Sequence, residues 1–429
     1  MSWFGDDDAA SQMLATAVAS ARNGDPRLAV HVCQQILADP GTDLGQRFQE
    51  VDRLREAVAT NTLAWLLLGS FQVDFAIDTG VDLDRVRGWL LPMRQRADEH
   101  LRARPAELEV HELRSVILVH LGDVAARTGG VLAGRDFYLE ALEGAQVLAA
   151  AHPSEPRWQR RLGLVHTKIG NLAAERGELE EATAAYRESL RLAKAMVATV
   201  PEIALDDVAI SHGKLAQMAS RLGDRDTARE HLEAAREAAE RRVGLVPGDP
   251  DALRSLSIVL ERIGDLALET DDLETARIAY HDNFRIVESL VRADPGHSGW
   301  QYDLAVCHQR LGMLAMAAGD LAAARKEHAA SVAVGERLAA ALPDELMLVA
   351  HLAAGYANLS SVAAQRADYA EAAELLGREA AVLADLMGRD PGNPRWPARL
   401  EENRQERAEL DTAPASRPPS RWPFGRRRN

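Results

Sequence analysis

Apolar residues recur every three or four positions along most of this chain, the spacing that places them on one face of an α-helix. The segment 153–201 shows the pattern clearly. Its first predicted helix carries the apolar residues Trp158, Leu162, Val165, Ile169 and Leu172. A second periodic run, from Leu179 to Val197, predicts a second helix. No strand-like alternation persists anywhere, so the pattern predicts an all-α protein.

The helical pattern repeats in units of about 48 residues, marked by prolines and small residues at fixed offsets. Prolines close successive units at Pro105, Pro153, Pro201, Pro247, Pro295, Pro343 and Pro391. One small residue per unit, which we call the anchor, lies at Gly122, Gly170, Ala216, Gly264, Gly312 and Ser360. Another small residue follows twelve positions later, at Gly134, Ala182, Ala228, Ala276, Ala324 and Ala372. This period is typical of solenoids, in which each unit contacts only its neighbours.

Turn residues separate the two helices of each unit. Gly177 is predicted to end the first helix of the segment 153–201, since glycine adopts the left-handed conformation without steric cost. The same junction, with substitutions, recurs at Gly223–Asp224, Asp271–Asp272, Gly319–Asp320 and Ala367–Asp368. Asp is a favoured N-cap for the next helix. Pro201 ends that second helix, because proline lacks the amide hydrogen. Each unit is therefore predicted to be a helical hairpin.

These units resemble the tetratricopeptide repeat family, whose pattern is Leu-Gly, then Ala-x-x-x-Phe/Tyr, then Pro. The matching residues are Leu121–Gly122, Ile169–Gly170, Ile263–Gly264, Leu311–Gly312, Ala182…Tyr186 and Ala276…Tyr280. The units have 48 residues rather than about 34, so each half gains about two helical turns. The resemblance implies an α-solenoid, a right-handed superhelix of tetratricopeptide-like helical hairpins. The unit 201–247 is two residues shorter, and we place the loss before Ala216, at the start of its first helix.

The spacing divides the chain into four regions. Residues 1–104 are predicted to form an N-terminal helical region, with one family-length repeat at 9–40 and a degenerate repeat in which Asp74 occupies the anchor. Six long repeats follow at 105–395, and 396–411 is predicted to be a polar capping helix that covers the last apolar face. Residues 412–429 are rich in Pro and Arg and are expected to be a disordered basic tail.

Charge and composition narrow the class of protein. The formal net charge is −15, and the last eighteen residues hold five arginines and no acid, so the remainder carries −20. A body of that charge repels nucleic acid and anionic membranes. Cys33 and Cys307 form no disulfide or zinc pattern, no secretory signal is evident, and the longest apolar run, Leu63–Leu68, is too short to cross a bilayer. We expect a soluble cytoplasmic protein without a transmembrane segment.

Residues suited to catalysis occur without a supporting pattern. The chain has no Gly-rich phosphate loop, GxSxG or HExxH motif. Three histidines lie four positions before an anchor, at His166, His212 and His308. Other units have Leu118, Leu260 and Tyr356 there, which favours packing in the core over a metal ladder. We therefore expect no enzymatic activity, no cofactor and no metal site.

Basic residues recur two positions before the anchor in four consecutive units, as Lys168, Lys214, Arg262 and Arg310. The family resemblance implies that this position faces the concave groove and that Asn171, one past its anchor, matches the Asn of a carboxylate-binding clamp. One interpretation is a cationic stripe that grips an acidic segment or C-terminal carboxylate of a protein or peptide partner. The other is that each charge pairs locally, as Arg262 would with Asp265.

The tail carries aromatic residues, which disordered segments usually lack. Trp422 and Phe424 lie beside Arg426, Arg427 and Arg428. This motif is either an anchor, docking in cis on the acidic body or in trans on an acidic partner or membrane, or a tolerated extension.

These features predict a non-catalytic protein–protein interaction scaffold that binds a partner segment in the concave groove. Two alternatives are a ligand- or peptide-responsive regulatory protein and an accessory subunit of a multi-protein effector or secretion system.

Overall fold

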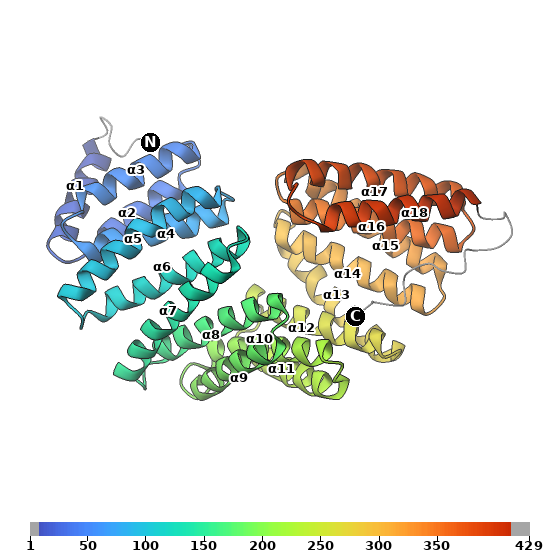
Figure 1. Cartoon of the computed structure of the whole chain (residues 1–429), viewed down its shortest axis with the longest axis horizontal. Coiled ribbons are helices and arrows are strands. Elements are labelled where there is room, and N and C mark those ends of the chain that lie inside the picture. Colours follow the sequence, from blue (N-terminus) through green and yellow to red (C-terminus); the bar gives the residue numbers. More distant parts are fainter. Residues whose placement is uncertain (1–7, 413–429) are drawn as a thin grey trace. The chain divides into compact units, whose positions relative to one another are not determined.

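The computed structural model describes residues 8–412, which form eighteen α-helices and no strand (Figure 1). This confirms the all-α prediction. The chain divides into two compact units, residues 1–218 and 219–429, which we call the N-terminal and C-terminal units. Within each unit, consecutive helices pack as antiparallel neighbours joined by short turns, so the predicted succession of helical hairpins is also confirmed.

The N-terminal unit begins with five helices: α1 (Asp8–Arg22), α2 (Arg27–Ala38), α3 (Leu44–Ala57), α4 (Thr62–Asp78) and α5 (Leu83–Ala103). The long hairpins follow with α6 (Leu108–Arg127), α7 (Val131–Ala151), α8 (Pro156–Arg176), α9 (Leu179–Met196) and α10 (Pro201–Arg221), whose last residues lie beyond the unit boundary. The C-terminal unit contains α11 (Arg225–Leu245), α12 (Pro250–Glu269), α13 (Leu273–Ala293), α14 (Ser298–Ala317), α15 (Leu321–Ala341), α16 (Leu346–Gln365), α17 (Tyr369–Arg389) and α18 (Arg395–Thr412).

The turns inside the hairpins have the predicted geometry. Gly177 ends α8 with a φ of +81°, in the left-handed region. The same place in other hairpins has positive φ at Gly129, Gly223, Asp271, Gly319 and Ala367. Asp224, Asp272, Asp320 and Asp368 then each accept a hydrogen bond from a backbone amide three residues on, as N-caps do. Glu178 makes no such bond.

The anchors Gly170 and Ala216 are 46 positions apart, and the two missing residues are lost at a different place from the one that the sequence predicts. α10 starts at Pro201 itself and has 21 residues, so this first helix is not shortened. Instead α9 has 18 residues and ends at Met196, whereas α7 and α11 have 21. Proline fits the first turn of a helix, where its missing amide hydrogen is not needed. The helix can therefore start at Pro201, and the helix before it ends early.

An aromatic ring packed on the anchor glycine holds the two helices of a hairpin together. In the α8–α9 hairpin, a Cβ placed on Gly170 would lie 2.6 Å from Cε1 of Tyr186, closer than atoms can pack. The rings of Tyr138, Tyr280 and His328 occupy the same place against Gly122, Gly264 and Gly312. The ring always comes from the residue sixteen positions after the anchor. Glycine is therefore required because the ring takes the space of its side chain.

Hairpins without an anchor glycine lack the ring as well. In the α16–α17 hairpin the anchor is Ser360, and the residue sixteen positions later is Leu376, which is fully buried. Ser360 Oγ donates to the carbonyl oxygen of Ala372, 2.9 Å away, across the same hairpin. The unit 201–247 has Ala216 and Leu232 at these positions. Anchor size and ring size thus change together along the chain.

The apolar helix α16 lies inside the C-terminal unit. By length and composition it could cross a membrane, with a mean hydropathy of 1.4 over its most apolar window, but 72% of that window is buried in the fold. No other helix in residues 8–412 passes this test. We interpret α16 as a core helix, packed between α15 and α17.

The last helix, α18, covers α17 through polar contacts. Asn403 is fully buried and donates to the carbonyl oxygen of Leu376 and to Glu379, at 2.9 and 2.8 Å. Arg399 pairs with the buried Glu379 at 2.6 Å and with Glu406 at 3.0 Å. Burial raises the pKa of Glu379 although Arg399 opposes the shift. A paired charge and an amide therefore join α18 to α17, and Leu410 of α18 packs into the same core cluster as Leu375 and Leu376 of α17.

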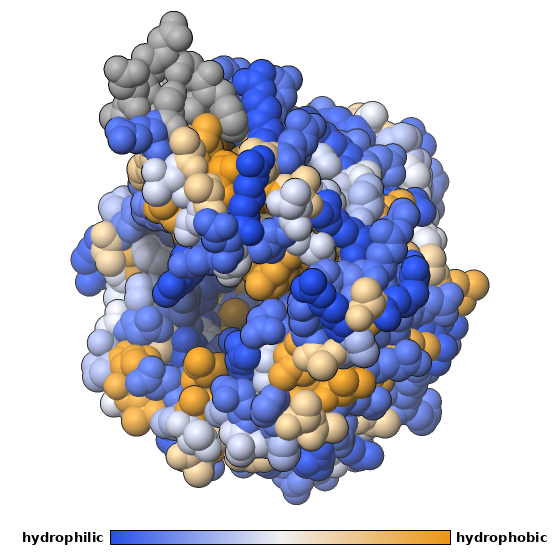
Figure 2. All heavy atoms as spheres, turned by 90° about the vertical axis from the view of Figure 1, so that its left-hand side faces the viewer, coloured by the Kyte–Doolittle hydropathy of each residue, from blue (hydrophilic) through white to orange (hydrophobic). Residues whose placement is uncertain are grey.

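The surface of the side that carries the N-terminal unit is mostly hydrophilic, with hydrophobic residues in separate patches (Figure 2). Exposed aliphatic side chains are scattered over different helices, among them Leu91, Leu132 and Val147. Single exposed apolar residues are normal on protein surfaces, so these side chains do not by themselves mark a binding site.

We predict that the sign of a Gly264→Ala substitution depends on the residue facing it. With Tyr280 present, the new methyl group overlaps the ring, and the free energy of unfolding should fall by about 1–3 kcal/mol. In a Tyr280→Leu background the overlap is gone, and alanine's higher helix propensity should add up to about 1 kcal/mol. Urea denaturation of the four proteins of this cycle measures both effects. The same sign in both backgrounds would contradict the packing argument.

Candidate functional site

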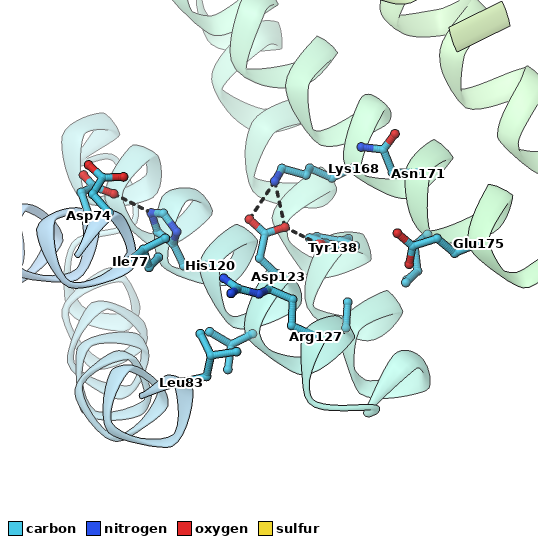
Figure 3. Close-up of a pocket in the computed structure, with 14 residues that line it drawn as sticks. Asp74, Ile77, Leu83, His120, Asp123, Arg127, Tyr138, Lys168, Asn171 and Glu175 are labelled. Carbon is cyan, nitrogen blue, oxygen red and sulfur yellow. Dashed lines mark hydrogen bonds and ion pairs between the residues drawn. The ribbon is translucent and has the colours of Figure 1, made fainter. Parts of the chain in front are cut away.

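A pocket of about 540 Å³ lies in the N-terminal unit, between the last turns of α4, α6 and α8 (Figure 3). Its apolar lining includes Ile77, Leu83, Val124 and Leu172. More of the lining residues are polar than apolar. The polar residues come from α4, α6 and α8, with one tyrosine from α7. Two predicted groove residues, Lys168 and Asn171, are brought together here.

Lys168 is held by an ion pair that joins two hairpins. Its Nζ lies 2.8 and 2.7 Å from the two carboxylate oxygens of Asp123 on α6. The hydroxyl of Tyr138, on α7, donates to the same carboxylate at 2.5 Å. Burial, together with the Asp123 hydrogen bond and charge, raises the pKa of Tyr138, so the hydroxyl stays a donor. Asp123 thus connects its own hairpin to the next one.

Asn171 takes the place of Asp123 in the following hairpin. Its Oδ1 accepts from the hydroxyl of Tyr186 at 2.9 Å. Among the described residues, its amide nitrogen has no hydrogen-bond partner and lines the pocket beside Lys168 (Figure 3).

On the α4 side of the pocket, another side-chain pair joins α6 to α4. His120 Nε2 on α6 lies 3.0 Å from Asp74 Oδ1. Nδ1 of the same ring is buried without a hydrogen-bond partner. The 48-residue spacing from Gly122 predicts Asp74 at the anchor. That assignment is wrong, because Asp74 is exposed and pairs with the next first helix, as Asp123 does one residue past its anchor. The degenerate repeat is offset by one residue, and the buried Val73 fills the anchor place.

Three charged residues of the pocket are exposed and form no hydrogen bond or ion pair with described residues: Asp78, Arg127 and Glu175. Each lies in the last turn of its helix, α4, α6 and α8 respectively. Sequence analysis missed all three. For Asp78 and Glu175 the available signal was an acid at the end of a helix, where the helix dipole disfavours negative charge.

The other predicted groove residues lie outside this pocket. Arg310, on α14, repeats the Lys168 geometry in the C-terminal unit and lies 2.9 Å from Glu261 and 3.0 Å from Asp265, both on α12. Burial would lower the pKa of Arg310, but the two carboxylates outweigh it and raise the pKa. Asp265, which we considered as a partner of Arg262, also accepts from Tyr280 at 2.7 Å. Lys214 and Arg262 are half-buried on α10 and α12.

The histidines before the anchors lie in packed surroundings. Burial lowers the pKa of His166, and His212 is buried. His308 Nδ1 lies 2.8 Å from Glu327, and its ring packs edge-on against Phe284. No group of three or more His, Cys, Asp or Glu in the part of the chain that the structure describes is arranged to hold a metal ion.

Neither cysteine is poised to react. Burial raises the pKa of Cys33 to about 12 and also raises the pKa of Cys307. The tail motif, Trp422, Phe424, Arg426, Arg427 and Arg428, lies outside the described residues.

Comparison with known proteins gives similar folds but no family. No protein-family model matches the chain, and no curated protein sequence does. Aspartyl phosphate phosphatase F from Bacillus subtilis is 10% identical, with 89% of this chain and 96% of that one covered and a TM-score of 0.49. BtubC (BKLC) from P. vanneervenii is 20% identical over 61% and 93% of the two chains, with a TM-score of 0.48. A tetratricopeptide repeat protein from Parabacteroides merdae is 14% identical over 80% and 99%, with a TM-score of 0.39.

We predict that acid weakens the C-terminal unit through two buried histidines. Burial lowers the pKa of both His328 and His351 to about 4. Above pH 6.5 these rings are neutral in the folded and the unfolded chain. As the pH falls toward 4, the unfolded chain takes up protons that the folded chain does not. The unfolding free energy should then fall by about 1.4 kcal/mol per pH unit for each histidine.

Urea denaturation between pH 6.5 and 5 measures this slope. His328→Phe keeps a ring against Gly312 and should roughly halve the slope. An unchanged slope in this variant would contradict the assignment to His328.

Proposed function

We propose that the protein is a non-catalytic interaction scaffold whose first helices bind a segment of a partner protein. The pocket between α4, α6 and α8 carries this proposal, because it is built from equivalent positions of successive hairpins. On α6 and α8 these positions lie two before, one after and five after the anchor: His120 and Lys168, Asp123 and Asn171, Arg127 and Glu175. A surface made from repeated positions suits an extended segment.

The chemistry of the pocket supports binding. Recognition sites combine apolar side chains with fixed polar groups, and the lining of this pocket has both, with polar residues in the majority. Lys168, Asp123 and Tyr138 are fixed by their mutual bonds, while the Asn171 amide nitrogen has no described partner. Lys214, Arg262 and Arg310 hold the equivalent position on their own helices, and we propose that they contribute to the equivalent faces there.

A ligand-responsive regulator is the second candidate, and the volume of the pocket favours it. Small-molecule sites usually measure about 300–1,000 Å³, and this pocket of about 540 Å³ falls in that range.

Filling the pocket tests the proposal. Ala126 lines it, and Ala126→Trp should occupy much of its volume. The matched control is Ala133→Trp, at an exposed position on α7 of the same unit. A phage-displayed library of random peptides is selected on the full-length wild type and on both variants, with circular dichroism confirming the helix content of each. Wild type and A133W should enrich a shared set of peptides that A126W loses.

Two results would overturn or redirect the proposal. If no peptide is enriched, or if A126W enriches the same set, the pocket is not a peptide-binding site. If A126W is misfolded, Arg127→Glu changes the charge of the same pocket at an exposed residue, and an unchanged set of enriched peptides in this variant would contradict the proposal. A thermal-shift screen with a small-molecule library covers the regulator, for which compounds should raise the melting temperature of wild type and A133W but not of A126W.

A further inference from the structure

We propose that the pocket between α4, α6 and α8 receives a basic side chain, an arginine or lysine of the partner segment. This deepens the proposed function and rests on it. It also reverses the sign of the partner charge that the basic ladder suggested, because the carboxylates of the pocket outnumber its cations.

The charges of the pocket sum to a negative value. Its lining holds four carboxylates and two permanent cations: Asp74, Asp78, Asp123, Glu175, Arg127 and Lys168. The Lys168 charge is already matched by Asp123 in an ion pair of 2.7 Å. Arg127 is exposed and reduces the negative potential without cancelling it. Asp78 and Glu175 have no partner among the described residues and are the groups left to bind a cation.

Three helix ends add to this potential. α4 ends at Asp78, α6 at Arg127 and α8 at Arg176, so the C-termini of three helices meet at the pocket. A helix C-terminus carries a partial negative charge from its unpaired carbonyl groups and favours cations nearby. Asp78 and Glu175 lie in last turns, where this field opposes a negative side chain. An incoming cation would relieve that repulsion.

The remaining lining fits the rest of a basic side chain. Ile77 and Leu83, both half-buried in the lining, offer apolar side chains against which the methylene stem of lysine or arginine can pack while its charge meets the carboxylates.

Charge removal without a change of shape tests the proposal. The full-length Asp78→Asn/Glu175→Gln variant removes the two unpaired carboxylates. The matched control, Asp136→Asn/Glu180→Gln, removes two exposed carboxylates of the same unit outside the pocket. The random-peptide library of the previous section is selected on wild type and both variants. Peptides enriched on wild type should be richer in Arg and Lys than the library, and the control should enrich the same set.

The most enriched peptide is then synthesised with a fluorophore, together with versions in which its basic residue is replaced by Gln or Glu. Fluorescence anisotropy gives each dissociation constant at low and raised salt. Replacement by Gln, or use of the D78N/E175Q variant, should weaken binding about tenfold. The control should change it less than about twofold, and raised salt should weaken wild-type binding.

The outcomes separate this inference from the proposed function. Enrichment of acidic peptides that A126W loses would overturn the basic side chain and leave the interaction scaffold in place. Equal affinity for the D78N/E175Q variant and its control would do the same. Absence of any pocket-dependent peptide would overturn both.

Discussion

The contact between an aromatic ring and an anchor glycine sets the geometry on which the other features of a hairpin depend. The ring of Tyr186 lies where a side chain of Gly170 would be, so the first and second helices approach closely. A buried tyrosine hydroxyl needs a hydrogen-bond partner, and the residue directly after the anchor supplies it, as Asn171 does here. The small anchor residue, the aromatic residue sixteen positions later and the acceptor directly after the anchor therefore depend on one another.

The acceptor also connects one hairpin to the next. Asp123 binds Tyr138 inside its hairpin and Lys168 on the following first helix. Asp265 binds Tyr280 and Arg310 in the same way in the C-terminal unit. Where the ring is His328, the residue after the anchor is Met313, and Nδ1 of the histidine has no partner. Lys168 and Arg310, the cations before their anchors, thus join neighbouring hairpins, with hydrogen bonds to charged groups worth about 1.5–3 kcal/mol each.

Sequence patterns were sufficient for the hairpins and insufficient for the site. Gly177, Asp224 and Pro201 mark helix ends through local conformational preferences, which act over a few residues. The pairing of Lys168 with Asp123 spans 45 positions and depends on how hairpins stack, so its partner could not be found by helical spacing within one helix. The pocket also needs α4, whose repeat is offset by one residue. Counting by 48 therefore misplaced Asp74 and missed Asp78.

The same geometry explains why matched and unmatched charges occur side by side in the pocket. Lys168 and Asp123 hold α6 and α8 together, so a ligand that took either one would loosen the contact between two hairpins. Asp78 and Glu175 hold nothing together among the described residues, and their position at helix C-termini costs about 0.3–1 kcal/mol each. A charged side chain that does not stabilise the fold can bind a ligand in place of water, and the contacts between hairpins stay intact. A repeat protein can therefore keep its cross-hairpin pairs closed and leave recognition to the exposed helix ends beside them.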